Sequence, residues 1–161
     1  MKVTVIVASN RAAQGVYADA SGPILRSGFQ EAGFDVDGPY VVADGEPVAQ
    51  ALRAAIAEDV DVVVTSGGTG LTSMDRTPET TKALVDREVP GVAEAIRSYG
   101  LGAYGGASGT PMAMLSRGIA GVAKRTFIVN LAGSTGAARD GLAVLLPVLP
   151  HIVDQIHDGD H

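Results

Sequence analysis

Apolar, β-branched runs alternate along the chain with stretches whose apolar residues recur at helical spacing. The continuous apolar runs predict three strands that are buried on both faces, at 3–8, 62–65 and 125–131. A fourth strand is expected within 34–43. Helical spacing and helix-start residues predict helices at 21–33, from 47 onward, at 80–88, at 91–101 and from Ser134 or Thr135 onward.

Prolines and glycines mark the predicted breaks. Pro147 and Pro150 are expected to kink or split the last helix, because proline lacks an amide hydrogen. Four glycines within 102–109 predict a loop or an arm. The segment 112–117 favours neither helix nor strand, and the polar tail at 158–161 is expected to fray.

The order of these elements predicts one α/β domain that covers residues 1–161. Strands that alternate with helices through short connections favour a parallel sheet with helices on both of its faces. Ligands bind beyond the carboxyl ends of the strands in such sheets. Four strand-end segments should therefore converge at one edge, and these are 9–11, Asp44, 66–75 and 130–135.

Composition narrows the chemistry at that edge. The absence of cysteine excludes a disulfide framework, a thiolate nucleophile and a cysteine-type zinc site, and it fits a reducing cytoplasm. All three histidines lie beyond residue 150, away from every predicted strand end, which argues against histidine catalysis or a histidine metal site. With a net charge of −6 and no membrane-length apolar run, we expect a cytoplasmic protein that binds neither nucleic acid nor membrane.

The most informative stretch is 61–80. Its buried strand breaks into Ser-Gly-Gly-Thr-Gly at 66–70, which is followed by Asp75 and by a helix start with Thr77 as N-cap and Pro78 in the first turn. Glycine loops and helix N-termini present backbone N–H groups to phosphates, and a nearby acid can hold Mg²⁺. The same glycines also suit a tight turn that binds nothing, and the loop matches neither the Walker A nor the dinucleotide fingerprint.

Two acids at these strand ends, Asp44 and Asp75, suggest phosphoryl or nucleotidyl transfer. Paired carboxylates can hold a hydrated Mg²⁺ and orient phosphates, which is most of what this chemistry requires. A phosphate monoester, with a second pKa of about 6, is already an anionic nucleophile at neutral pH. Simpler roles remain open: either acid could only support a cap or a turn. Arg11 and Arg117 could be solvated surface charges, and Ser134 could be only an N-cap.

Several motifs, in the same order, resemble the Mog/MoaB family of molybdenum cofactor biosynthesis proteins. The most specific is Thr-Ser-Gly-Gly-Thr-Gly at 65–70, with Asp75 and then Thr-Pro-Glu at 77–79. The resemblance covers nearly the whole chain, because further matching motifs lie at 9–11, 15–19, 115–118 and 130–134.

The resemblance implies a three-layer α/β/α sandwich of the molybdopterin-binding, MoaB/Mog-like type with a mostly parallel sheet, assembled as a homotrimer. Active members are molybdopterin adenylyltransferases, in which the terminal phosphate of molybdopterin attacks the α-phosphate of Mg-ATP and pyrophosphate leaves. By position, Asp44 and Asp75 correspond to the catalytic acids that hold Mg²⁺. The implied substrate- and nucleotide-binding residues are Ser66, Gly67, Gly68, Thr69, Gly70, Thr77, Pro78, Ser116, Arg117 and Ser134. Molybdopterin synthase and the molybdate-insertion protein are the implied protein partners.

Four positions depart from the family pattern. Asn10 stands where Asp is common, and Met74 stands where Arg is frequent, which leaves open whether Arg76 supplies the missing charge. Ala132 replaces the usual proline, and Thr135 occupies a position where proline often follows the serine.

Two other functions stay compatible with the resemblance. One is a non-catalytic molybdopterin-binding or carrier paralogue, against which the retention of both Asp44 and Asp75 argues. The other is a different pathway for the same fold, as in molybdate-insertion and competence/damage-inducible proteins, whose related domains usually belong to longer chains. Adenylyl transfer is therefore the favoured hypothesis.

Overall fold

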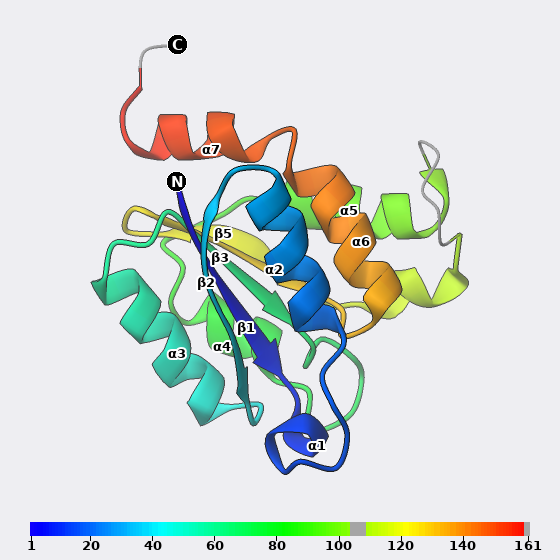
Figure 1. Ribbon diagram of the computed structural model, residues 1–161. Coiled ribbons are helices and arrows are strands. Elements are labelled where there is room, and N and C mark those ends of the chain that lie inside the picture. The colour runs from blue at the N-terminus through cyan, green and yellow to red at the C-terminus, as the bar shows by residue number, and fades with distance from the viewer. Residues whose placement is uncertain (104–108, 160–161) are drawn as a thin grey trace.

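The computed structural model describes residues 1–103 and 109–159 (Figure 1). The centre of the predicted glycine arm, 104–108, and the last two residues of the predicted tail lie outside the described residues.

Six strands among the described residues form one sheet, in the order β2-β1-β3-β6-β5-β4. The first four strands of this order are parallel, and β5 and β4 extend the sheet antiparallel at one edge. The bounds are β1 (Lys2–Ala8), β2 (Asp35–Val42), β3 (Val62–Ser66), β4 (Arg87–Glu88), β5 (Ala120–Ala123) and β6 (Thr126–Leu131). The predicted α/β fold with a mostly parallel sheet is confirmed.

Helices cover both faces of the sheet, as Figure 1 shows. Helices α2, α6 and α5 pack in a row on one face, and α3 with α4 lies on the other. The bounds are α1 (Asn10–Ala13), α2 (Ser21–Glu31), α3 (Glu46–Ala57), α4 (Thr77–Lys82), α5 (Pro90–Gly100), the 3₁₀ helix η2 (Pro111–Leu115), α6 (Thr135–Leu145) and α7 (Leu149–Ile156).

Alternate side chains of the central strands fill two separate cores. Val3 and Val5 of β1 pack with α2 and α6, whereas Ile6 of the same strand packs with α3. Val62 and Val63 of β3 divide between the two cores in the same way. Because side chains alternate between the faces of a strand, only a continuous apolar run can serve both cores. The ends of these strands are thereby fixed in place.

The predicted helix at 80–88 is confirmed only as far as Lys82, and its second half is wrong. Helix α4 begins at Thr77 and ends at Lys82, and Arg87–Glu88 forms strand β4, which pairs with β5. The short β5 was not predicted, because Ala-Gly-Val-Ala has no long apolar run. A residue far away in the sequence stabilises the turn after β5, since the Lys124 N–H donates to Asp86 Oδ2 at 2.6 Å.

The predicted break in the last helix is confirmed. Helix α6 ends at Leu145, α7 begins at Leu149, and the two helices are bent by 63°. Within residues 1–103 and 109–159, no single helix is long and apolar enough to cross a membrane, although this bent pair passes the length and composition test when its helices are taken together.

Candidate active site

The main pocket lies beyond the carboxyl ends of the parallel strands, beside the segment that carries α1. The sheet order reverses direction between β1 and β3, because β2 follows β1 on one side and β3 lies on the other. Such a switch point is where open α/β sheets bind ligands. The cavity has a volume of about 610 Å³, and all four predicted strand-end segments contribute residues to it. Their predicted convergence is confirmed.

Glycine is required in the loop after β3 because other groups occupy the space of a side chain. Gly67 has a φ of 96°, and a Cβ there would lie 2.2 Å from the Ala8 carbonyl oxygen. Gly68 has a φ of 65°, and its Cβ would lie 2.2 Å from both Asp44 Oδ2 and Thr77 Oγ1. The loop therefore runs between the end of β1 and the Asp44 carboxylate with no room for larger residues.

Three donors hold the Asp44 carboxylate at the edge of this loop. Oδ1 accepts the Gly45 N–H at 2.6 Å and the Thr77 hydroxyl at 3.2 Å, and Oδ2 accepts the Arg76 N–H at 2.9 Å. The Asp44 N–H itself donates to Asn10 Oδ1 at 3.0 Å. The amide oxygen of Asn10 thus does what an aspartate oxygen would do there, so this departure from the family pattern leaves the Asp44 position intact.

Among the described residues, only one oxygen of the Asp75 carboxylate accepts hydrogen bonds. Its Oδ2 accepts the Thr72 N–H at 3.0 Å and the Thr72 hydroxyl at 2.7 Å. Its Oδ1 has no hydrogen-bond partner among residues 1–103 and 109–159, and Asp75 lines the main pocket. Asp75 also adjoins the glycine loop, since a Cβ on Gly70 would lie 2.9 Å from its Oδ2.

The predicted N-cap role of Thr77 is wrong. The N-cap position of α4 belongs to Arg76, and Thr77 is the first helical residue, buried beside Pro78. The Thr77 hydroxyl donates to Asp44 instead, which joins the helix start to the second acid.

Arg76 lies apart from the main pocket that Met74 lines. Arg76 lines a separate cleft of about 330 Å³ between α3 and α4, and it is not among the lining residues of the main pocket. Met74 does line the main pocket, so an apolar side chain lies at the position where the family resemblance favours arginine.

Arg117 braces the glycine loop from the other side. Its Nε donates to the Gly70 carbonyl oxygen at 2.7 Å, one terminal nitrogen donates to the Asp75 carbonyl oxygen at 2.8 Å, and the other binds the Glu79 carboxylate. The hydrogen bond with Glu79, together with the charges of Glu79, Asp75 and Asp44, raises the pKa of Arg117 above its ordinary value. The guanidinium is therefore a brace with protein partners, and its predicted contact with substrate stays a prediction.

Sequence reasoning placed Asn130 at a converging strand end but gave its buried side chain no role. Its side-chain amide donates to Thr65 Oγ1 at 3.0 Å and to Thr81 Oγ1 at 2.9 Å, and its Oδ1 accepts the Ile119 N–H at 3.2 Å. It therefore ties β3, β6, α4 and the entry to β5 together. The signal in the sequence was one polar amide inside the apolar run of β6.

Three predicted binding residues have structural partners. Buried Ser66 donates its hydroxyl to Ser21 Oγ at 2.9 Å, and Ser116 donates to Thr69 Oγ1 at 3.2 Å. Ser134 is the N-cap of α6, where its Oγ accepts the Ala137 N–H at 3.0 Å. Ser66, Ser116 and Thr69 line the main pocket, but Ser134 does not.

Acids outnumber bases around the pocket. Among the described residues, its charged lining residues are Asp19, Asp44, Asp75 and Arg11. The Arg11 guanidinium lies 5.1 Å from the ring centroid of Tyr17, whose hydroxyl is 3.0 Å from Ser9 Oγ. A polyanionic ligand would therefore enter a pocket with more negative than positive side chains, which favours a ligand that brings its own cation.

The brace between Arg117 and Glu79 predicts an acid-dependent loss of stability. The hydrogen bond from Arg117 lowers the pKa of Glu79 below its ordinary 4.5. A carboxylate with a lowered folded-state pKa stabilises the protein above its unfolded-state pKa, and this contribution is lost as the pH falls through the lowered value. Glu79→Gln should cost about 0.5 kcal/mol at pH 7, since the pair is partly exposed, and the cost should shrink below pH 4.5. Urea unfolding across this pH range measures both, and a pH-independent difference would contradict the prediction.

Comparisons with known proteins identify the family of this chain. The family described as a probable molybdopterin binding domain matches residues 4–151. The molybdopterin adenylyltransferase of Helicobacter pylori is 34% identical over 96% of this chain and 86% of that protein. The molybdenum cofactor biosynthesis bifunctional protein of Chlorobaculum tepidum is 38% identical over 99% of this chain, which spans about half (50%) of that relative.

A solved structure agrees with the fold. The molybdopterin biosynthesis Mog protein from Mycobacterium ulcerans is 48% identical, with a TM-score of 0.88 over 96% of this chain and 98% of that one. The fold and this family match thus place the chain in a class of α/β domains described as probable molybdopterin binding domains. The chain is a member of the Mog/MoaB family of molybdenum cofactor biosynthesis proteins.

Proposed function

We propose that this protein transfers AMP from Mg-ATP to the terminal phosphate of molybdopterin, with release of pyrophosphate. The observation that carries the proposal is that, among the described residues, unpaired backbone N–H groups and an unpaired oxygen of the Asp75 carboxylate occur at the same pocket. The N–H groups of Gly68, Thr69 and Gly70 make no hydrogen bond to the described residues, and all three residues line the cavity beside Asp44 and Asp75. Successive unpaired backbone N–H groups are a common phosphate-binding arrangement.

The chain's own residues would bind and orient rather than remove protons. The phosphate of molybdopterin is anionic at neutral pH and can attack the α-phosphate without a strong general base. The donors of the glycine loop would hold phosphate oxygens in line, and the brace from Arg117 to the Gly70 and Asp75 carbonyl oxygens would keep the loop fixed. In this arrangement the new phosphorus–oxygen bond forms as the bond to pyrophosphate breaks.

The residues present fit a magnesium ion. Within the described part of the chain, no group of three or more acidic, histidine or cysteine residues could hold a metal by itself. Magnesium usually takes only one or two carboxylates and completes its shell with waters and substrate phosphates. Asp75, with its unpaired Oδ1, and Asp44 would supply those carboxylates. When bound, the ion would offset phosphate charge that Arg11, the one arginine among the described lining residues, leaves uncompensated.

The test is a transfer assay with purified protein, molybdopterin and Mg-ATP that follows AMP-linked pterin and pyrophosphate. We expect both products in equal amounts, and none when EDTA removes the magnesium. Tight molybdopterin binding without product at saturating Mg-ATP would instead support the carrier paralogue, which the apolar Met74 in place of a phosphate-binding arginine would then explain. The homotrimer and the contacts with molybdopterin synthase and the molybdate-insertion protein stay predictions of the resemblance.

A further inference from the structure

Three residues that line the main pocket are large, apolar and exposed, in contrast to the polar backbone of its glycine loop. Met74, Met112 and Leu115 all line the cavity, with relative exposures of 61%, 65% and 43%. They come from two segments that are far apart in sequence, the loop that follows the glycines and the 3₁₀ helix η2. Single exposed apolar residues are ordinary on protein surfaces, but three that line one ligand-sized cavity are a feature of the site.

The two segments are fastened to each other by hydrogen bonds. The Arg117 N–H donates to the Thr69 carbonyl oxygen at 2.9 Å, and Ser116 Oγ donates to Thr69 Oγ1 at 3.2 Å. These contacts tie the residues that follow η2 to the glycine loop, so the methionines of the two segments border one cavity. The pocket thus combines backbone donors and carboxylates with thioether and aliphatic surface.

A ligand that matches both parts carries phosphate at one end and a flat, polarisable ring at the other. Thioether sulfurs make favourable contacts with aromatic rings, and methionine adapts its shape to an irregular partner. We infer that Met74 and Met112, with Leu115, form a binding surface for the planar heteroaromatic ring of a substrate of this pocket. This inference rests on the proposed function, in which two substrates, ATP and molybdopterin, carry such a ring.

Met74 adds no charge to the pocket that it lines. An arginine there would bind a phosphate through charge, whereas Met74 contributes ring contact and no charge. The ring, rather than an additional phosphate contact, is then what this side chain recognises.

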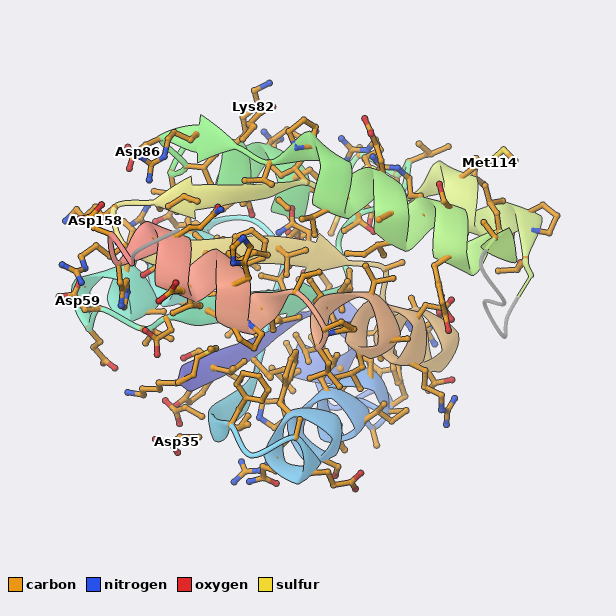
Figure 2. The ribbon with its side chains drawn as sticks, turned by 90° about the horizontal axis from the view of Figure 1, so that it is seen from above. Asp35, Asp59, Lys82, Asp86, Met114 and Asp158 are labelled. Atoms are coloured by element: carbon orange, nitrogen blue, oxygen red, sulfur yellow. The ribbon has the colours of Figure 1, made fainter. Side chains whose placement is uncertain are left out.

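Met114 provides the matched control. It belongs to η2 like Met112 and is similarly exposed, at 59%, but it does not line the cavity. Figure 2 shows Met114 at the outer tip of this segment, pointing away from the sheet. A general effect of losing an exposed methionine from η2 would therefore appear equally in Met112→Ala and Met114→Ala.

The experiment compares ligand dissociation constants of the wild type with those of Met74→Ala, Met112→Ala and Met114→Ala by isothermal titration calorimetry. The probes are Mg-ATP, magnesium tripolyphosphate, which has no ring, and molybdopterin. We expect Met74→Ala and Met112→Ala to weaken a ring-bearing probe about two- to tenfold, while tripolyphosphate binding and the Met114→Ala protein stay unchanged. A loss confined to Mg-ATP assigns the adenine ring to this surface, and a loss confined to molybdopterin assigns the pterin.

Other results would overturn the inference. Unchanged binding of both ring-bearing probes would do so, as would equal losses in Met112→Ala and Met114→Ala or a tripolyphosphate loss as large as that of Mg-ATP. The test is separate from that of the proposed reaction. If these residues bind the ring but no AMP-linked pterin forms, the ring-binding surface is supported and the proposed reaction is wrong. If AMP-linked pterin forms but the methionine variants bind both ring-bearing probes normally, the proposed reaction is supported and the ring-binding surface is wrong.

Discussion

Replacing Gly67 by alanine should lower the free energy of unfolding by more than about 3 kcal/mol. The alanine would be held at a φ of 96°, and its Cβ would lie 2.2 Å from the Ala8 carbonyl oxygen at the end of the central strand β1. That oxygen belongs to the backbone of a buried strand and cannot turn aside as a side chain would. The Gly67 N–H also donates to the Leu131 carbonyl oxygen at 3.0 Å, so a shift of the loop would strain its attachment to β6 as well. Urea unfolding of both proteins measures the loss.

Two other glycines distinguish the cost of backbone strain from the cost of a steric clash. Gly15 has a φ of 73° with no atom within 4 Å of an added Cβ, so Gly15→Ala should cost about 1 kcal/mol from backbone strain alone. Gly91 has open space and is not among the glycines with positive φ, so Gly91→Ala should be neutral or slightly stabilising. If the Gly67 and Gly15 variants lost equal stability, the close approach to Ala8 would not be what requires glycine in the loop.

The sequence predicted the parts of this fold that depend on local pattern. Strands β1, β3 and β6 are continuous apolar runs because both of their faces are buried, and that pattern is visible without any partner. The convergence of the strand ends followed from parallel topology, and the glycine loop from three glycines beside an acid. The split between α6 and α7 followed from Pro147 and Pro150.

What the sequence could not predict depends on distant partners. Strands β4 and β5 are short, and they are strands only because they pair with each other and β5 pairs with β6. Thr77 has the chemistry of an N-cap, but a carboxylate 33 positions earlier takes its hydroxyl. Arg117 could equally have been a surface charge, and only the folded chain brings Gly70, Asp75 and Glu79 around it.

The two acids should respond differently to loss of charge. Asp75→Asn should lower the rate of AMP transfer about 100-fold or more. A carboxylate that holds a metal ion next to the developing phosphate charge stabilises the transition state by several kcal/mol. The stability of this variant should change by no more than about 0.5 kcal/mol, since an asparagine oxygen can still accept from Thr72. Asp44→Asn should also lose turnover, but it should in addition lose about 1–2 kcal/mol of stability. Its three donors, from Gly45, Arg76 and Thr77, would meet an amide group that cannot accept from all of them.

Transfer rates across a magnesium titration, together with urea unfolding, distinguish these roles. Thr72→Ala is the control, because it removes a hydroxyl that orients Asp75 at 2.7 Å but keeps the charge, so a smaller loss of turnover is expected. If Asp75→Asn kept the wild-type rate, Asp75 would be only a turn-supporting residue and the metal assignment would be wrong. If both asparagine variants lost turnover but higher magnesium restored Asp75→Asn alone, Asp75 would hold the ion directly. Asp44, fixed by three protein donors, would then act mainly by keeping the glycine loop and α4 in place.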